Sequence, residues 1–191
     1  MGMILASTSV YRSQLLERLG IPFTRVAPKF DEATVKSESF SPAGLARHLA
    51  TEKVMSLMAE YPDDTIIGGD QVVDLDGRVL GKPGTIDHVI NQLTELSGRS
   101  HRLVTAVAVW DEGRLFTHVD ITTMTMRTLE LAAIHRYVMA DKPVDCAGSY
   151  MLEAHGITLF ESIETADYTA IIGMPLMALT SMLRSIGYVV P

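Results

Sequence analysis

The stretch DTIIGGDQVVDLDGRVLGKP, residues 64–83, contains two apolar runs joined at Asp76-Gly77. An Asp-Gly pair between such runs is a strong signal for a tight hairpin turn, so the stretch predicts two antiparallel strands. Asp70 lies inside the first run, where a carboxylate is unfavourable unless it is paired, hydrogen-bonded or bound to a metal. Gly68 and Gly69 precede it and allow a ligand or another backbone to approach closely. Asp70 is therefore either a cap at a bulge or strand end or, as we prefer, a functional carboxylate.

The amino-terminal stretch MILASTSVYRSQLLERLGI, residues 3–21, predicts a short buried strand followed by a helix that Gly20 stops. Ser9 is a natural N-cap, because its hydroxyl can accept a hydrogen bond from a free N–H of the first turn. A helix N-terminus that carries several hydroxyls, with Arg12 one turn in, is also suited to bind an anion such as phosphate. The stretch alone leaves both interpretations open.

Outward from these two stretches, strand and helix patterns alternate along the chain. We expect helices within 41–63 (capped by Ser41), 86–98 (capped by Thr85), 129–141 and 175–187, a hairpin over 102–126 that turns near Glu112-Gly113, and one more strand within 146–164. This order predicts a mixed α/β sheet covered by helices. Because no proline- or glycine-rich linker divides the chain, we expect a single domain over 1–191, which is compatible with two lobes and a cleft between them.

Composition and charge narrow the classes of function. The 191 residues are 47% apolar and 20% charged, which is typical of a globular protein, and the net charge is −7 without a basic tract. This charge argues against a nucleic-acid polymer as partner. The single Cys146 excludes an intramolecular disulfide and fits a reducing compartment. No segment reads as a signal peptide or a membrane span, so we expect a cytoplasmic protein without a membrane partner.

Several other charged residues are ambiguous when taken one at a time. Lys53 lies beside the apolar stripe of its helix and is either a snorkelling lysine or an ammonium aimed at a phosphate. Lys82, Glu32 and Glu153 each fit an exposed loop equally well. Phosphoryl chemistry needs cations for phosphates and carboxylates for a metal and for water. One set of residues in the chain suits it: the helix start with its hydroxyls and Arg12, the two lysines Lys53 and Lys82, and the carboxylates Glu32 and Asp70.

Seven motifs in order make the pattern recognisable: LASTSVYR (5–12), DE (31–32), EK (52–53), GGDQVV (68–73), GKP (81–83), CAGSYMLEAHGITLFESIE (146–164) and IIGMPL (171–176). Over essentially the whole chain they resemble the Maf-like nucleoside triphosphate pyrophosphatases. The resemblance implies an α/β fold with an elongated mixed sheet flanked by helices, related to that of inosine triphosphatases. It also implies hydrolysis of a nucleoside triphosphate to the monophosphate and diphosphate with a divalent cation (Mg²⁺, Mn²⁺ or Co²⁺), and assembly as a homodimer.

The resemblance also implies roles for individual residues. The phosphate-binding residues would be Ser7, Ser9, Arg12, Lys53 and Lys82. Glu32 and Asp70 would hold the metal, and Asp70 would also be the catalytic proton acceptor. Two alternatives stay open: a dTTP/UTP pyrophosphatase of the same family, and a nucleotide-sensing regulator of cell division without turnover. The presence of both carboxylates favours an enzyme.

Three positions bear on the substrate. At these positions this chain has Tyr11, Gln71 and Glu153. The dTTP/UTP branch of the family usually has Arg, Thr and Gln there. The 7-methyl-GTP branch usually has Trp, Gln and Glu. The sequence therefore resembles the branch that hydrolyses 7-methyl-GTP to 7-methyl-GMP and diphosphate. It departs from the family pattern at Val10, where proline is usual, at Ser13, where a second arginine is frequent, and at ETAD (164–167), where GD is common.

Overall fold

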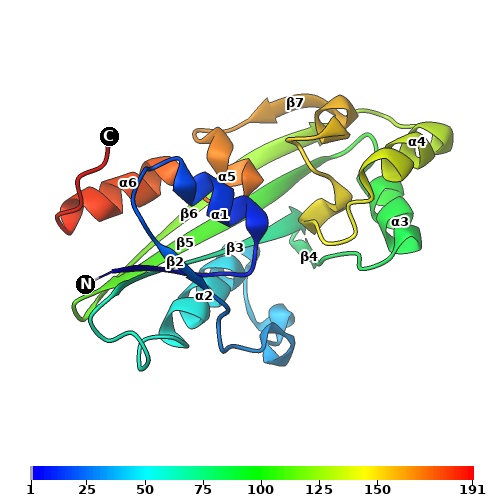
Figure 1. The fold of residues 1–191 in the computed structure, drawn as a ribbon. Coiled ribbons are helices and arrows are strands. Elements are labelled where there is room, and N and C mark those ends of the chain that lie inside the picture. Colours follow the sequence, from blue (N-terminus) through cyan, green and yellow to red (C-terminus); the bar gives the residue numbers. More distant parts are fainter. Residues whose placement is uncertain (1) are drawn as a thin grey trace. The chain divides into compact units, whose positions relative to one another are not determined.

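A computed structural model describes residues 2–191 (Figure 1). These residues divide into two compact units. The first unit consists of the chain up to Gln71 together with Thr105–Asp120 and Asp167–Pro191, and the second consists of Val72–Val104 and Ile121–Ala166. The long strands β3 (Thr65–Leu75), β5 (Ser100–Asp111) and β6 (Arg114–Met126) each contribute residues to both units. A single domain over 1–191 stays a prediction.

The strands form a mixed sheet, as predicted. Within residues 2–191 seven strands pair in the order β2-β1-β3-β5-β6-β7, and β4 (Arg78–Leu80) pairs with β3. Strand β1 (Met3–Ala6) runs parallel to both β2 (Thr24–Val26) and β3. The β3–β4 and β6–β7 pairs are antiparallel, with β7 at Phe160–Glu164. Parallel and antiparallel pairs together confirm the α/β class.

In the first unit, two helices begin at the predicted caps. Its helices are α1 (Val10–Glu17), α2 (Pro42–Met55), α5 (Tyr168–Ile172), α6 (Leu176–Ser185) and the 3-10 turns η1 (Glu32–Thr34) and η2 (Ser37–Ser39). Ser9 and Ser41 cap α1 and α2 through their hydroxyls, as expected. Helix α2 ends at Met55, earlier than the predicted segment to residue 63, and Leu57 packs inside from the following turn.

The second unit contains the predicted β-turn and two packed helices. Its helices are α3 (Ile86–Leu96), α4 (Leu131–Asp141) and the 3-10 turns η3 (Ala147–Ser149) and η4 (His155–Leu159). Asp76 and Gly77 have φ of 54° and 88°, the left-handed geometry that a two-residue hairpin turn requires, so the Asp-Gly prediction is confirmed. Thr85 caps α3 by accepting from the His88 N–H. None of the helices within residues 2–191 has both the length and the apolar character needed to cross a bilayer.

Candidate active site

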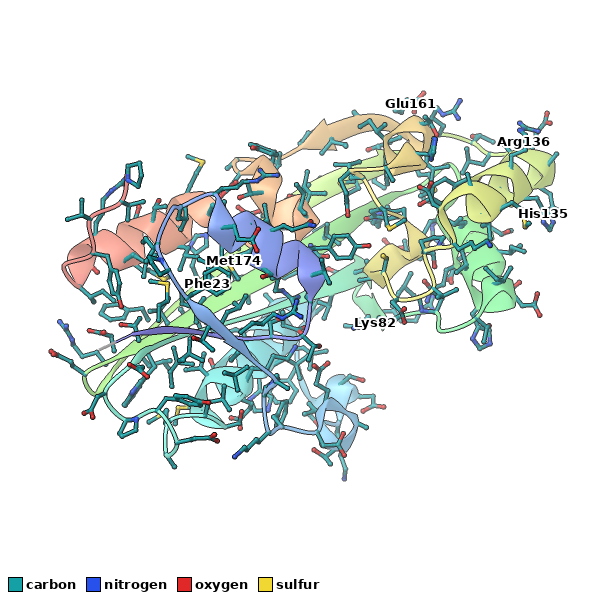
Figure 2. All side chains as sticks on the ribbon, in the orientation of Figure 1. Phe23, Lys82, His135, Arg136, Glu161 and Met174 are labelled. Atoms are coloured by element: carbon teal, nitrogen blue, oxygen red, sulfur yellow. The ribbon has the colours of Figure 1, made fainter. Side chains whose placement is uncertain are left out.

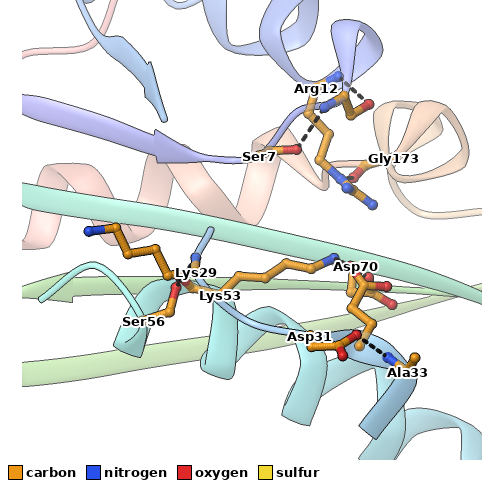
Figure 3. Close-up of polar contacts among 11 residues, drawn as sticks. Ser7, Arg12, Lys29, Asp31, Ala33, Lys53, Ser56, Asp70 and Gly173 are labelled. Atoms are coloured by element: carbon orange, nitrogen blue, oxygen red, sulfur yellow. Dashed lines mark hydrogen bonds and ion pairs between the residues drawn. The ribbon is translucent and has the colours of Figure 1, made fainter. Parts of the chain in front are cut away.

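The carboxylate inside the apolar run of β3 is paired with a buried lysine (Figure 3). Lys53 Nζ lies 2.6 Å from Asp70 Oδ1 and 2.8 Å from Glu32 Oε1. The Lys53 and Asp70 side chains are 6% and 9% exposed, whereas Glu32 is 50% exposed. Lys53 therefore does not snorkel to solvent but ends between two carboxylates. Asp70 lies in the middle of β3, so it is not a strand-end cap.

Gly68 explains how a lysine of α2 reaches a strand residue. A Cβ at Gly68 would lie 2.6 Å from the Ala50 carbonyl oxygen and 2.7 Å from Val54 Cγ2. Because Gly68 has no side chain, α2 packs directly on β3. Side chains two apart on a strand share a face, so Asp70 points toward the same helix and meets Lys53 there. The expectation that the glycines admit a closely packed backbone is confirmed.

A short segment before α2 brings the second carboxylate to the same lysine. Asp31 Oδ1 accepts from the Ala33 N–H at 3.0 Å and fixes η1, whose first residue is Glu32. The Lys29 N–H donates to Ser56 Oγ at 3.0 Å, just beyond the end of α2. These two contacts hold the exposed loop so that Glu32 reaches Lys53.

Arg12 of α1 lies against the other face of β3, and most of its hydrogen-bond donors have no partner within residues 2–191. A Cβ at Gly69 would lie 3.3 Å from Arg12 Nε, so this glycine makes room for the arginine stem. Arg12 Nε donates to the Gly173 carbonyl oxygen at 3.0 Å, while its two terminal nitrogens have no hydrogen-bond or ion-pair partner within residues 2–191 (Figure 3). Burial lowers the pKa of Arg12, and the negative charges of Asp70 and Glu32 oppose that shift. A charged guanidinium with free terminal donors is suited to a phosphate.

The hydroxyls at the start of α1 serve the backbone first. Ser7 Oγ accepts from the Ser9 N–H at 3.1 Å, and Ser9 Oγ accepts from the Arg12 N–H at 3.4 Å. The capping prediction for Ser9 is confirmed. Since each hydroxyl accepts a bond from an N–H, each keeps its own proton as a donor. Phosphate binding by Ser7 and Ser9 stays a prediction that this arrangement allows.

Gln71 points away from Asp70, as the alternation of a regular strand requires. Its side-chain nitrogen donates to Thr105 Oγ1 at 2.9 Å and to the carbonyl oxygens of Ala170 and Ile171 at 2.9 and 3.0 Å. Tyr11, on the first turn of α1, is 37% exposed. Sequence reasoning missed Thr105, although a hydroxyl residue within an apolar strand is a signal of the same kind as Asp70.

Two predicted site residues belong to the second unit. Lys82 is exposed in the loop between β4 and α3 (Figure 2), and Glu153 is exposed in the turn before η4. The structure thus brings together Arg12, Glu32, Lys53 and Asp70 in the first unit. The participation of Lys82 and Glu153 stays a prediction.

The carboxylates fit a divalent cation that arrives with a substrate. Within residues 2–191 no three His, Cys, Asp or Glu side chains are grouped as a metal cage. Glu32 and Asp70 offer two carboxylates joined by one ammonium. Mg²⁺ is typically bound by one or two carboxylates together with substrate phosphates and water, rather than by a dedicated all-protein cage. The donor set therefore fits this mode of binding.

Comparison with known proteins gives one family over nearly the whole chain. Residues 2–186 match the family model described as Maf-like protein. The chain is 46% identical over 183 residues to the 7-methyl-GTP pyrophosphatase of Bdellovibrio bacteriovorus, covering 96% of each chain. It is 45% identical to the 7-methyl-GTP pyrophosphatase of Xanthomonas axonopodis pv. citri, covering 99% of this chain and 98% of that protein. The Staphylococcus aureus Ham1 protein shares the fold, with a TM-score of 0.53 at 13% identity over 97% of this chain and 99% of that one.

Proposed function

Because the chain belongs to the Maf-like family, we propose that it is a nucleoside triphosphate pyrophosphatase that hydrolyses 7-methyl-GTP to 7-methyl-GMP and diphosphate. One observation supports this chemistry most strongly: the buried Lys53 ammonium contacts both Asp70 and Glu32. These two carboxylates are also close enough to Arg12 to affect the pKa of its guanidinium. Hydrolysis of a triphosphate needs carboxylates that activate water and cations that stabilise negative charge, and this cluster supplies both.

Asp70 is the proton acceptor in the proposed reaction. Its Oδ1 is engaged by Lys53, and its Oδ2 has no hydrogen-bond or ion-pair partner within residues 2–191. Water attacks the α-phosphorus, a new P–O bond forms, and the bond to the bridging α–β oxygen breaks. The proton of the water passes to Asp70 Oδ2, and diphosphate leaves with the electron pair of the broken bond.

The cations and hydroxyls hold the triphosphate. The terminal donors of Arg12 and the hydroxyl protons of Ser7 and Ser9 bind phosphate oxygens, and Lys53 places positive charge beside the reacting group. Lys82 adds a second ammonium. Glu32 and Asp70 would hold a divalent cation (Mg²⁺, Mn²⁺ or Co²⁺), which neutralises charge on the triphosphate.

Three residues recognise the base in this proposal. Methylation at N7 gives guanine a positive charge while its N1–H and exocyclic amine remain donors. The carboxylate of Glu153 accepts from these donors and offsets the charge, which a neutral glutamine does less well. The exposed ring of Tyr11 offers a π-face to the cationic base, worth about 0.5–2 kcal/mol. Gln71 of β3 is the third residue that recognises the base.

Partners follow from the same proposal. The nucleotide is the substrate, and the net charge of −7 disfavours a nucleic-acid polymer. We propose a cytoplasmic homodimer. Sedimentation velocity at micromolar concentration tests the dimer, since a monomer at all concentrations contradicts it.

A nucleotide panel tests the function. Phosphate release is measured in the presence of added inorganic pyrophosphatase for 7-methyl-GTP, GTP, dTTP and UTP with Mg²⁺ or Mn²⁺. We expect the highest kcat/KM for 7-methyl-GTP, and a smaller preference in Glu153→Gln. Faster hydrolysis of dTTP or UTP would contradict the assignment of 7-methyl-GTP as substrate but not the pyrophosphatase reaction. Tight binding of all four nucleotides without turnover would indicate a sensor instead of an enzyme.

A further inference from the structure

Thr105 is a buried hydroxyl residue within the apolar part of β5. The residue is 1% exposed, and its neighbours in the strand are apolar. Thr105 Oγ1 donates to the Ala170 carbonyl oxygen at 2.9 Å and accepts from Gln71 Nε2 at 2.9 Å. A hydroxyl that donates its single proton to one group can only accept from the other. Thr105 Oγ1 is therefore one of the acceptors that face the Gln71 amide nitrogen.

The amide of Gln71 has one favourable orientation. Its nitrogen is surrounded by three acceptors: Thr105 Oγ1 and the carbonyl oxygens of Ala170 and Ile171. A flipped amide would place an oxygen against two carbonyl oxygens at about 3 Å, with no proton between them. The nitrogen is consequently turned inward. The oxygen, Oε1, has no hydrogen-bond partner within residues 2–191.

The carbonyls that accept from this nitrogen belong to the short helix α5, which is anchored at both of its ends. Asp167 caps the start of α5 by accepting from the Thr169 N–H at 2.9 Å, and it also accepts from the Met177 N–H at 2.8 Å. Arg12 binds the Gly173 carbonyl directly after the helix. The segment that carries the acceptors is thus anchored at both ends, which preorganises the Gln71 amide.

We propose that Thr105 is a positioning residue for substrate selection. Together with the Ala170 and Ile171 carbonyls, it holds the amide nitrogen of Gln71 inward, so that Gln71 presents only an acceptor. The site then selects bases that carry an amine at C2, such as guanine, and rejects bases without one, such as adenine. This inference rests on the proposed function, because it assigns Gln71 to base recognition.

Steady-state kinetics on GTP and ATP test the proposal, since neither base is methylated at N7 and they differ at the edge that carries these groups. In Thr105→Val, which keeps the shape but loses the hydroxyl, we expect the ratio of kcat/KM for GTP over ATP to fall about five- to tenfold, mainly through KM for GTP. Thr105→Ser keeps the hydroxyl and restores the ratio to within about twofold of the wild-type value. A merely structural role would lower kcat/KM for both nucleotides by one factor and so leave the ratio unchanged, which would overturn the proposal.

A double-mutant cycle with Gln71→Leu makes the test specific. If Thr105 acts through Gln71, Thr105→Val changes the GTP/ATP ratio no further in the Gln71→Leu background. A second drop in that background would overturn the proposal. Should Thr105→Val fail to fold, the smaller Thr105→Ala carries the same test. A wild-type protein that hydrolyses no triphosphate contradicts the proposed function, whereas an active wild type with an unchanged ratio in the variant contradicts only this inference.

Discussion

Asp70 and Asp74 are two buried aspartates four residues apart on β3, and their surroundings differ in one decisive respect. Asp74 is 1% exposed, and both of its oxygens are occupied: Oδ1 accepts from the Gly77 N–H at 2.7 Å, and Oδ2 accepts from the Arg102 guanidinium, whose Nε lies 2.8 Å away. Asp70 has one oxygen on Lys53, and the other has no partner within residues 2–191.

The difference separates a carboxylate that holds structure from one that can react. Asp74 closes the β3–β4 turn and binds across to β5, so that both of its oxygens are engaged within the protein. Asp70 is held in place through one oxygen, which leaves the second to accept a proton. We therefore expect a buried carboxylate in an apolar strand to be functional only when its hydrogen-bonding capacity is incompletely used.

Asp70→Asn should have the largest effect. Asparagine keeps the shape and an acceptor for Lys53 but cannot take a proton from water, so we expect kcat for 7-methyl-GTP to fall by about two to four orders of magnitude. Asp74→Asn is the matched control. It should lower the free energy of unfolding by about 1–2 kcal/mol, measured by urea denaturation, and leave kcat within about twofold. Equal losses of turnover in both variants would remove the distinction between the two carboxylates.

Lys53→Ala and Lys82→Ala compare a buried ammonium with an exposed one. Loss of a charged hydrogen bond to phosphate costs roughly 1.5–3 kcal/mol, so we expect each variant to lose about ten- to a hundredfold in kcat/KM. Lys53→Ala also leaves Asp70 buried without its counter-ion and should lower the melting temperature, whereas Lys82→Ala should not. Kinetics and calorimetry on the same samples separate the two effects. Unchanged kinetics for either variant would contradict phosphate binding by that lysine and leave it only a surface or structural role.

His101 gives the second unit a pH-dependent stability that should not depend on Asp70. The residue is 3% exposed, Nε2 lies 2.9 Å from Tyr150 Oη, and Nδ1 is buried without a partner within residues 2–191. Burial lowers the pKa of His101 to about 4. As pH falls below the unfolded pKa of about 6.5, the unfolded state binds the proton first, so stability falls between there and pH 4.

From pH 7.5 to pH 5 this histidine should cost the protein about 2 kcal/mol of stability, by the difference between its two pKa values. His101→Phe keeps an aromatic ring beside Tyr150 and Phe160, and urea denaturation at both pH values should show a correspondingly smaller loss. If wild type and variant lose stability equally over this range, the histidine is not buried in its neutral form.

Gly68→Ala should have the smallest effect of the four. The added Cβ would meet the Ala50 carbonyl and Val54 below 3 Å, so we expect about 1–2 kcal/mol less stability and a reduced kcat as Lys53 moves away from Asp70. Gly81→Ala is the control, because its Cβ would meet nothing within 4 Å. Thermal melts and kcat for both variants check this, and indistinguishable results would contradict the packing argument.

Much of the fold was predictable because its signals are local. The Asp76-Gly77 turn and the Ser9, Ser41 and Thr85 caps depend on a few adjacent residues, and each was confirmed. Strand β2 was missed because it is three residues long and two of them are exposed, so it has no apolar pattern and exists through pairing with β1. Helix α5 was missed because its five residues span little more than one turn.

The site was predictable in part. Asp70 was found because a carboxylate is unfavourable in an apolar strand, and Lys53 was left undecided because its partner lies 17 residues away. The carbonyls of Ala170, Ile171 and Gly173 could not be found, because backbone oxygens have no signature in side-chain chemistry. Roles in phosphate and base binding come from family resemblance and stay predictions.

A single-turnover experiment in H₂¹⁸O tests most directly the central claim that Asp70 activates water rather than attacking phosphorus itself. With wild-type protein in excess over 7-methyl-GTP, the first turnover should give 7-methyl-GMP carrying one ¹⁸O and unlabelled diphosphate, as read by mass spectrometry. Unlabelled monophosphate with ¹⁸O in the Asp70 carboxylate would show a covalent enzyme intermediate. Label in the diphosphate would place the attack at the β-phosphorus. Either result would contradict the account.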